Sequence, residues 1–312
     1  MTSACTSKNM RRTPGRIILA ALLLACGCCH TATGPHLRPY YGPTESMASV
    51  AQQVNANNEK IPTLWANLNY SAMVNENGTT HSVSGGDGIL LYSQPSDFRL
   101  VAKKEFVGTV FDLGTNGKEY WLEVVPGTNR MWWGRYDDLV HTQLGKSPIP
   151  IRPDLVLEVL GVSLINRDFN VPPVPTMRFN NDEDAYMFVF NVHAPDRWLA
   201  LKEVWYDRAS HRPRRVILYD ANGRAVLRAD LSMDTKVQVP GEDPRTWPVM
   251  AGDYKLFFPD TGSRMEFTVK DVRLYKQNPG GRLKVPNASS FAMPDVQGTD
   301  VRPIQIGGGG DH

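Results

Sequence analysis

The four cysteines of this chain are the residues whose chemistry is easiest to define, and all of them lie near the N-terminus. They are Cys5, Cys26, Cys28 and Cys29. Because no cysteine follows position 29, residues 30–312 contain neither an internal disulfide nor a cysteine metal site. Cys26 directly follows the apolar run 17–25, and the residues before that run include bases but no acids. A basic segment, an apolar segment and a small residue before the cut are typical of a secretion signal. The bases are Lys8, Arg11, Arg12 and Arg16.

The sequence around Cys26 points to acylation of its sulfur. Leu23-Leu24-Ala25-Cys26 resembles the lipobox of bacterial lipoproteins, which predicts a lipoprotein signal peptide over residues 1–25 and a lipid on Cys26. Ala25-Cys26-Gly27-Cys28 offers a second register, in which Cys28 carries the lipid. A plain secretory peptide with incidental cysteines is the remaining interpretation. The nine apolar residues of the run are too few for a membrane span, which needs about 20.

The charge balance changes once the signal is removed. Loss of four of the 34 basic residues leaves 30 against 32 acidic residues, a net charge of −2 in place of +2. A nearly neutral chain has no broad cationic field for phosphate, so we expect no nucleic-acid partner.

No catalytic signature stands out in the rest of the chain. Leu144-Gly145-Lys146-Ser147 ends like a phosphate loop, but Val140 stands where that motif needs glycine. The histidines show no metal-binding spacing, and the acidic run 181–184 is typical of a solvated turn. We therefore expect no catalytic residues, no metal, no cofactor and no enzyme activity. A hydrolase with a pair of acids facing a cleft stays open as an alternative.

The elements that would position a ligand site follow a short linker. Residues 26–43 carry several glycines and prolines and predict a lipidated tether, and Thr44 is expected to cap a helix that ends at Ile61-Pro62. From Thr63 the apolar period changes to two, which predicts a long half-buried strand. We expect a single domain over residues 44–295 and a disordered Gly-rich tail over residues 296–312.

Many further strands are expected, interrupted by one helix. Turn residues separate alternating segments up to about residue 136, and the pattern resumes from Ala185 to about Tyr275. Between them, residues 153–165 carry apolar side chains at three- and four-residue spacing behind a proline, which predicts an inserted helix. The predicted class is α+β, mainly β: a strongly curved antiparallel sheet, or half-open β-barrel, covered by a few helices.

Three local stretches resemble the LolA/LolB superfamily of lipoprotein carriers and acceptors. Residues 61–66 (IPTLWA) resemble the entry into the first strand, residues 205–223 the strand-and-turn succession of the second half-barrel, and residues 285–294, with Phe291 and Pro294, the closing segment. The resemblance spans about residues 44–295 and implies a half-open barrel lidded by helices. The lipobox sets this chain apart from soluble carriers of the superfamily and favours anchored acceptors or lipid-binding relatives.

If the fold is a half-barrel, its inner face is an apolar cavity for acyl chains, because burying a methylene needs no polar partner. Large apolar side chains on the strands are the candidate lining, although the same residues would also pack a closed core without a ligand. The candidates are Leu64, Leu68, Tyr70, Leu91, Leu100, Leu122, Val124, Phe188, Phe190, Trp205, Ile217 and Leu227.

These features together predict a lipid-anchored cell-envelope protein that binds acyl chains of a lipoprotein or lipid during transport or localisation. Its expected partners are the membrane, through the N-terminal lipid, and a periplasmic carrier protein. Gly27 rather than Asp follows Cys26, which favours the outer membrane, facing the periplasm. The alternative is an anchored structural or protein-interaction lipoprotein with a filled core and no ligand.

Overall fold

The computed structural model describes residues 42–76, 78–106, 108–125, 129–139, 153–277 and 283–306. The chain divides into two units, Met1–Tyr40 and Tyr41–His312, and all described residues belong to the second. The predicted signal peptide, Cys26, Cys28 and nearly all of the tether lie outside the described residues. None of the helices in the described ranges combines the length and apolar character that crossing a membrane requires.

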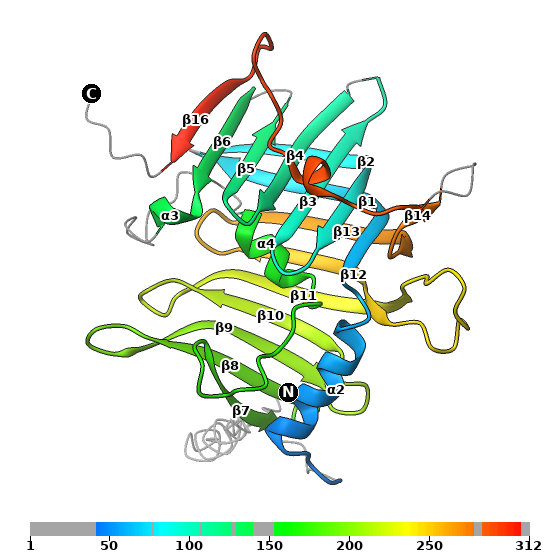
Figure 1. The fold of residues 1–312 in the computed structure, drawn as a ribbon. Coiled ribbons are helices and arrows are strands. Elements are labelled where there is room, and N and C mark those ends of the chain that lie inside the picture. Colours follow the sequence, from blue (N-terminus) through cyan, green and yellow to red (C-terminus); the bar gives the residue numbers. More distant parts are fainter. Residues whose placement is uncertain are drawn as a thin grey trace, which may run out of the picture. The chain divides into compact units, whose positions relative to one another are not determined.

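One large curved sheet dominates the described unit (Figure 1). Its 14 strands run in the order β16-β6-β5-β4-β3-β2-β1-β13-β12-β11-β10-β9-β8-β7, so β16 and β7 are its edges. All neighbouring strands pair antiparallel except β16 and β6. The predicted open, curved antiparallel sheet with few helices is therefore confirmed.

The strands have the following bounds: β1 Thr63–Glu76, β2 Thr79–Ser93, β3 Asp97–Lys104, β4 Gly108–Asn116, β5 Glu119–Val124, β6 Arg130–Arg135, β7 Val174–Asn180, β8 Ala185–His193, β9 Trp198–Asp207, β10 Pro213–Tyr219, β11 Ala225–Lys236, β12 Val249–Phe258, β13 Ser263–Arg273 and β16 Arg302–Ile306. A separate pair is formed by β14 Lys276–Gln277 and β15 Leu283–Lys284.

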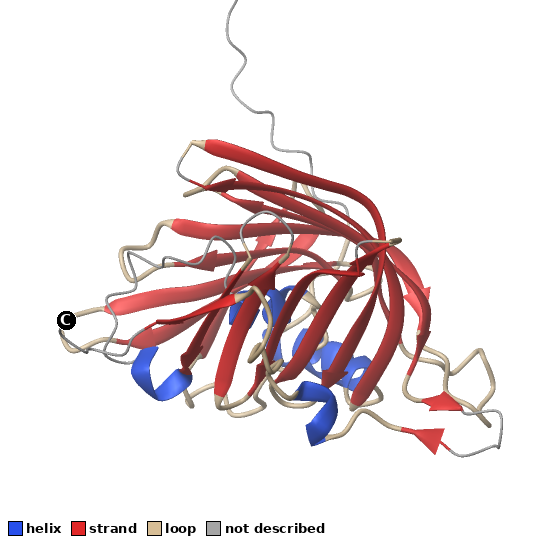
Figure 2. Cartoon of the chain, turned by 90° about the horizontal axis from the view of Figure 1, so that it is seen from above, coloured by secondary structure: helices blue, strands red, loops and turns tan. Residues whose placement is uncertain are grey.

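Two helices, α2 and α4, lie on one face of the curved sheet (Figures 1 and 2). Helix α2 (Met47–Asn58) begins two residues later than predicted, because Ser46 is the N-cap and its Oγ accepts a hydrogen bond from Ser49 N at 3.2 Å. Helix α3 (Tyr136–Leu139) is a single turn that follows β6, and η2 (Ala288–Phe291) is a 3-10 turn near the C-terminal end.

Helix α4 (Pro153–Val159) is shorter than the predicted helix over 153–165, which is therefore wrong beyond Val159. Gly161 adopts a left-handed φ of 69°, a conformation that commonly ends a helix. Asn58 of α2 then donates hydrogen bonds to the carbonyls of Gly161 and Ser163. The segment after α4 is thus held against α2 by polar contacts, while Leu160 and Val162 stay buried.

The C-terminal part of the chain extends the sheet. Residues 302–306 form β16, although the sequence places them in a disordered tail from residue 296. The tail prediction is corrected for these five residues, because they pair in parallel with β6 and Ile306 is 7% exposed in the core. The strand has only five residues, and the ten residues before it are exposed or half-exposed. Five residues carry too little alternation of apolar and polar side chains to predict a strand from the sequence.

The registers of the ladder define the two faces of the sheet. The inner face carries Leu64, Leu68 and Tyr70 of β1. Their partners other than glycine belong to one core cluster that also includes residues of α2 and α4. Gly86 faces Tyr70 in this register, and a Cβ there would lie 2.3 Å from the Tyr70 ring. Glycine at this position therefore lets the Tyr70 ring lie flat against the strand.

Candidate functional site

The inner face of the sheet is a continuous apolar surface, and it is the candidate acyl-binding site. In the described parts of β7 to β13, its buried side chains are aliphatic or aromatic apart from the tyrosine hydroxyls and the hydroxyl of Ser263, the first residue of β13. Nine of the twelve sequence-predicted lining residues lie on this face, eight within the core cluster and Val124 packed against it. The nine are Leu64, Leu68, Tyr70, Leu100, Leu122, Val124, Phe188, Phe190 and Leu227.

The other three predicted residues, Leu91, Trp205 and Ile217, project from the outer face. Their neighbours along the chain, such as Leu90 and Val204, take the inner positions. Large apolar side chains occupy both faces of these strands, so the period of two does not say which face is inside. The three residues are not brought together with the other nine.

Trp205 instead belongs to a polar network on the outer face. Its indole N–H donates to the carboxylate of the buried Glu203, and the Tyr219 hydroxyl donates to the other oxygen of that carboxylate at 3.1 Å. The Arg215 guanidinium lies 4.6 Å from the Trp205 ring centroid. Burial, followed by the charge of Glu203, raises the pKa of Tyr219 to about 12. This arrangement satisfies a buried carboxylate and explains the position of Trp205 without a ligand.

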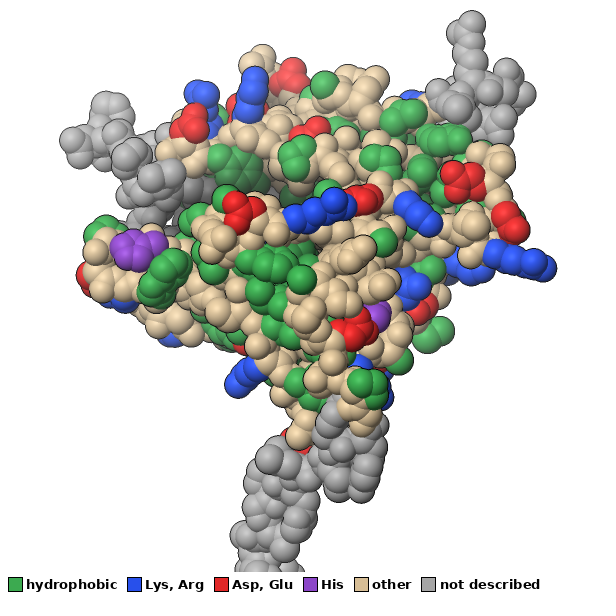
Figure 3. Space-filling model, turned by 60° about the horizontal axis from the view of Figure 1, so that its bottom comes forward, with side chains coloured by type: hydrophobic (Ala, Val, Ile, Leu, Met, Phe, Trp, Pro, Cys, Tyr) green, Lys and Arg blue, Asp and Glu red, His purple; other side chains and the backbone are tan. Residues whose placement is uncertain are grey.

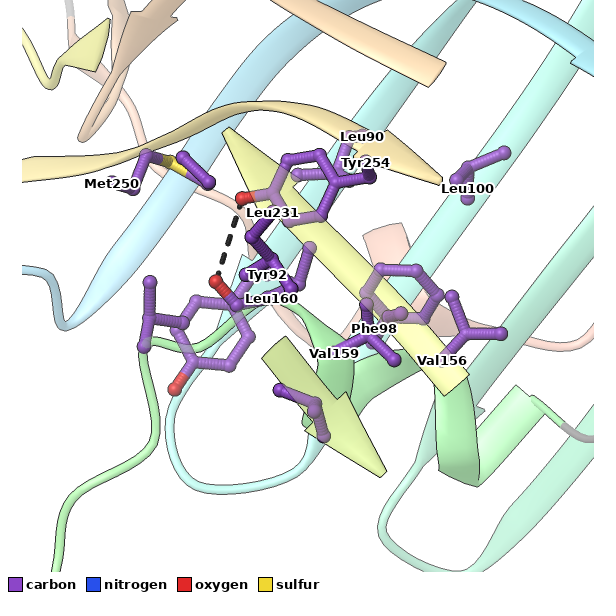
Figure 4. Packing of buried hydrophobic residues seen from close by; sticks show 14 of the residues in the cluster. Leu90, Tyr92, Phe98, Leu100, Val156, Val159, Leu160, Leu231, Met250 and Tyr254 are labelled. Carbon is purple, nitrogen blue, oxygen red and sulfur yellow. Dashed lines mark hydrogen bonds between the residues drawn. The ribbon is translucent and has the colours of Figure 1, made fainter. Parts of the chain in front are cut away.

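Helix α4 occupies the space in front of the inner face. Val156, Val159 and Leu160 have 0% exposure and point toward side chains of β2, β3, β11 and β12 (Figure 4). The helix contacts β4 and β5 on one side and β10 on the other, so it lies between the two halves of the curved sheet. The interior is therefore filled by the chain's own apolar side chains in this structure.

Two hydrogen bonds link the described part of α4 and the residue after it to the sheet. Glu158 Oε2 accepts a hydrogen bond from Lys202 Nζ of β9 at 2.5 Å, and the Leu160 carbonyl accepts one from the Tyr254 hydroxyl at 3.4 Å. The second bond is long, and its donor can turn to other acceptors. The buried described side chains of α4 meet the sheet through apolar contacts, and the chain after the helix is joined to α2 by the hydrogen bonds from Asn58 to Gly161 and Ser163.

Several tyrosines add hydroxyls to the inner face without adding charge. Burial raises the pKa of Tyr206 and Tyr254 above the usual value of a phenol, and at Tyr206 the charge of Glu158 adds to this rise. The same two causes raise the pKa of Tyr92. These hydroxyls stay protonated at neutral pH, so the lining remains uncharged where they occur.

Phe106, which the sequence reading did not single out, is the most exposed apolar side chain of the described residues. It lies at the tip of the β3–β4 hairpin, is 98% exposed and has a left-handed φ of 64°. Lys103 and Lys104 precede it on the same hairpin and are also exposed. A left-handed φ is uncommon for an aromatic residue, and no pattern in the sequence signals it, because φ and exposure are properties of the folded chain.

A polar groove of about 510 Å³ is lined by the first residues of β10 and the C-terminal half of β11. Its arginines are paired with acids: Arg212 with Asp234, and Arg215 with Asp230. Across the described ranges, no group of three or more His, Cys, Asp or Glu side chains is arranged to hold a metal ion. On the face drawn in Figure 3, hydrophobic side chains gather near the centre, and charged side chains lie around them.

Comparison with known proteins gives similarity of fold at low sequence identity. No family model and no curated protein matches the chain. A solved domain described as an outer membrane lipoprotein-sorting protein, from Vibrio parahaemolyticus, is 14% identical over 72% of this chain and 91% of its own, with a TM-score of 0.45. A LolA superfamily protein from Nitrosomonas europaea is 11% identical over 81% of this chain and 99% of its own, with a TM-score of 0.44.

A DUF1329 family protein from Desulfovibrio piger is also similar, at 8% identity over 72% of this chain and 90% of its own, with a TM-score of 0.36. The superfamily named by the sequence resemblance is thus present among the similar structures. The proposals below about ligand, partner and location rest on the residues of this chain.

Proposed function

We propose that this protein binds acyl chains of a lipoprotein or lipid on the inner face of its half-barrel, as a non-enzymatic, lipid-anchored protein of the bacterial cell envelope. The observation that carries the proposal is the apolar inner face, which continues across both halves of the sheet and is covered by the buried apolar side chains of α4. The proposed anchor is Cys26, with Cys28 as the alternative, and the proposed location is the outer membrane facing the periplasm.

The exchange of α4 for an acyl chain is close to balanced in free energy. Exposing three Val or Leu side chains costs about 1.5–3 kcal/mol each, and burying a methylene contributes about 0.8 kcal/mol. Burial of roughly six to eleven methylenes therefore offsets the withdrawal of Val156, Val159 and Leu160. Common acyl chains are longer than this, so a ligand of ordinary length buries enough methylene groups to offset the exposure of these three side chains.

Weakening the packing of α4 is expected to favour ligand binding. Val159→Ala removes apolar contact from a side chain with 0% exposure, so less free energy is lost when the helix leaves. We expect several-fold tighter binding of cis-parinaric acid, measured by its fluorescence on delipidated protein. Met187→Ala is the matched control, because Met187 is 3% exposed but faces outward from β8. Equal effects of the two variants would contradict displacement of α4.

Native mass spectrometry after gentle extraction tests the proposal independently. A reproducible added mass that matches a lipid is expected. Absence of bound lipid, together with no uptake of cis-parinaric acid by the delipidated protein, would favour the second candidate, an anchored structural or protein-interaction lipoprotein. The complete burial of the α4 side chains is the observation in favour of that candidate.

The β3–β4 tip is proposed to contact the membrane surface, because an exposed aromatic residue near two exposed lysines, which outnumber the adjacent exposed Glu105, suits the interface of an anionic bilayer. Phe106→Ser is expected to weaken binding to vesicles that contain anionic phospholipid several-fold in a sedimentation assay, with no loss of thermal stability, since the side chain is 98% exposed. Met233→Ser is the matched control: Met233 is also exposed, at 69%, and has a φ of 58°. Unchanged vesicle binding by Phe106→Ser would overturn this contact.

A further inference from the structure

Lys202 is a charged residue in an apolar environment. In the ladders that join β7 to β11, all of whose residues are described, its position on the inner face is flanked by Phe190 and Leu218, which are 6% and 3% exposed. Lys202 Nζ lies 5.0 Å from the Phe190 ring centroid, and the Lys202 side chain is 18% exposed. The ammonium group therefore lies near the rim of the apolar surface, where its chain packs on apolar side chains and its charge reaches solvent.

The partner of Lys202 is a carboxylate on the helix that must leave. Glu158 Oε2 lies 2.5 Å from Lys202 Nζ, and Glu158 is on α4 between Val156 and Val159. Withdrawal of the helix removes the carboxylate together with the apolar side chains. Glu203, adjacent to Lys202 in sequence, cannot take its place, because it projects from the outer face and is bound by Trp205 and Tyr219. The tyrosines near Glu158, Tyr92 and Tyr206, are neutral.

We propose that Lys202 binds the anionic head of the acyl ligand, a carboxylate or a phosphate ester, in place of Glu158. This inference depends on the proposed function and narrows its ligand class to acidic amphiphiles. A ligand whose chain lies against Phe190 and Leu218 brings its head to the rim, where Lys202 has lost its partner. Glu158 and the ligand head are then competitors for one ammonium group, just as the α4 side chains and the ligand tail compete for one apolar surface.

The test compares an acidic probe with its neutral counterpart on delipidated full-length protein. Lys202→Met keeps the length of an unbranched chain and removes the charge. It is expected to weaken binding of cis-parinaric acid about tenfold, because one charge-assisted hydrogen bond is lost. Binding of the methyl ester is expected to change less than about twofold. Lys202→Arg is expected to restore binding of the acid. Lys255→Met, on the outer face of β12, is the matched control and is expected to change neither probe.

Glu158→Gln separates headgroup binding from simple attachment of the helix. If Lys202 and Glu158 only hold α4 in place, removing either charge loosens the helix and strengthens binding of both probes equally. Under the proposal, Glu158→Gln strengthens binding of the acid more than that of the ester, while Lys202→Met weakens binding of the acid alone. Equal responses of acid and ester in both variants would overturn the role of Lys202 and leave acyl binding intact. Failure of the unaltered protein to bind either probe would instead overturn the proposed function.

The source of the anion is distinguished by displacement of bound cis-parinaric acid. Lysophosphatidic acid and palmitic acid carry the same kind of tail with a phosphate or a carboxylate head. At least one of them is expected to displace the probe from the unaltered protein and to lose about tenfold in potency with Lys202→Met. The stronger competitor identifies the head. If each competitor displaces the probe from Lys202→Met as potently as from the unaltered protein, the proposal is contradicted.

Discussion

Cys26→Ala is expected to abolish incorporation of labelled palmitate and to release the protein from the membrane fraction. The sulfur of the residue after the cut is the acceptor for lipid in the lipobox that residues 23–26 resemble. Acyl chains supply the membrane affinity, at about 0.8 kcal/mol per buried methylene, and stable anchoring takes more than one chain. Loss of the acceptor therefore removes every chain at once, and the expected change is all or none.

Cys28→Ala is the matched control and is expected to keep both the label and the membrane location. Both variants alter one small residue in the same short segment, so a general effect on export would appear in each. Label that persists in Cys26→Ala and disappears in Cys28→Ala would assign the lipid to Cys28. Label in both variants would contradict exclusive attachment of the lipid at Cys26.

Asp112→Ala is expected to lower the free energy of unfolding by about 3 kcal/mol or more. Asp112 is 3% exposed on the outer face and accepts hydrogen bonds from Arg99 Nη2 at 2.6 Å and from Trp121 Nε1 at 3.0 Å. Arg99 also donates to the Ser290 carbonyl of η2 at 3.1 Å. Removal of the carboxylate leaves a largely buried guanidinium and a buried indole N–H without their acceptor, which costs more than the ion pair contributes. Urea unfolding followed by circular dichroism measures the change.

Asp196→Ala provides the comparison for an exposed pair. Asp196 and Arg197 are 3.2 Å apart, and their side chains are 69% and 54% exposed, so solvent screens the pair. We expect a change below about 0.5 kcal/mol. If Asp112→Ala cost no more than this control, the carboxylate would not be the link that joins β3, β4 and η2.

The sequence predicted the fold better than it predicted the site. Alternation along β1 identified the inward positions of Leu64, Leu68 and Tyr70, because the strand presents apolar side chains to one face and mostly polar ones to the other. The same reasoning reversed the faces at Trp205 and Ile217, where both faces carry large side chains. Face selection depends on which side other elements cover, and covering elements are distant in sequence.

The features that carry the proposals arise from contacts between distant segments. Glu158 and Lys202 are 44 residues apart, and their pairing depends on the placement of α4 against β9. The inserted helix was expected, but its early end at Val159 was set by Gly161 and by Asn58 of another helix. Phe106 differs from other apolar residues in its exposure and its φ, and both are properties of the folded chain.

The cysteine positions and the N-terminal charge pattern are properties of the sequence alone, and the prediction of an anchor at Cys26 depends on nothing else. The period of two and the turn residues likewise determined that the chain forms a long series of strands, because these signals are local. Only the tertiary structure decided which face became the interior, that α4 fills it and that β16 forms one edge of the sheet. Those outcomes depend on burial between segments far apart in the chain, and local residue patterns do not specify burial partners.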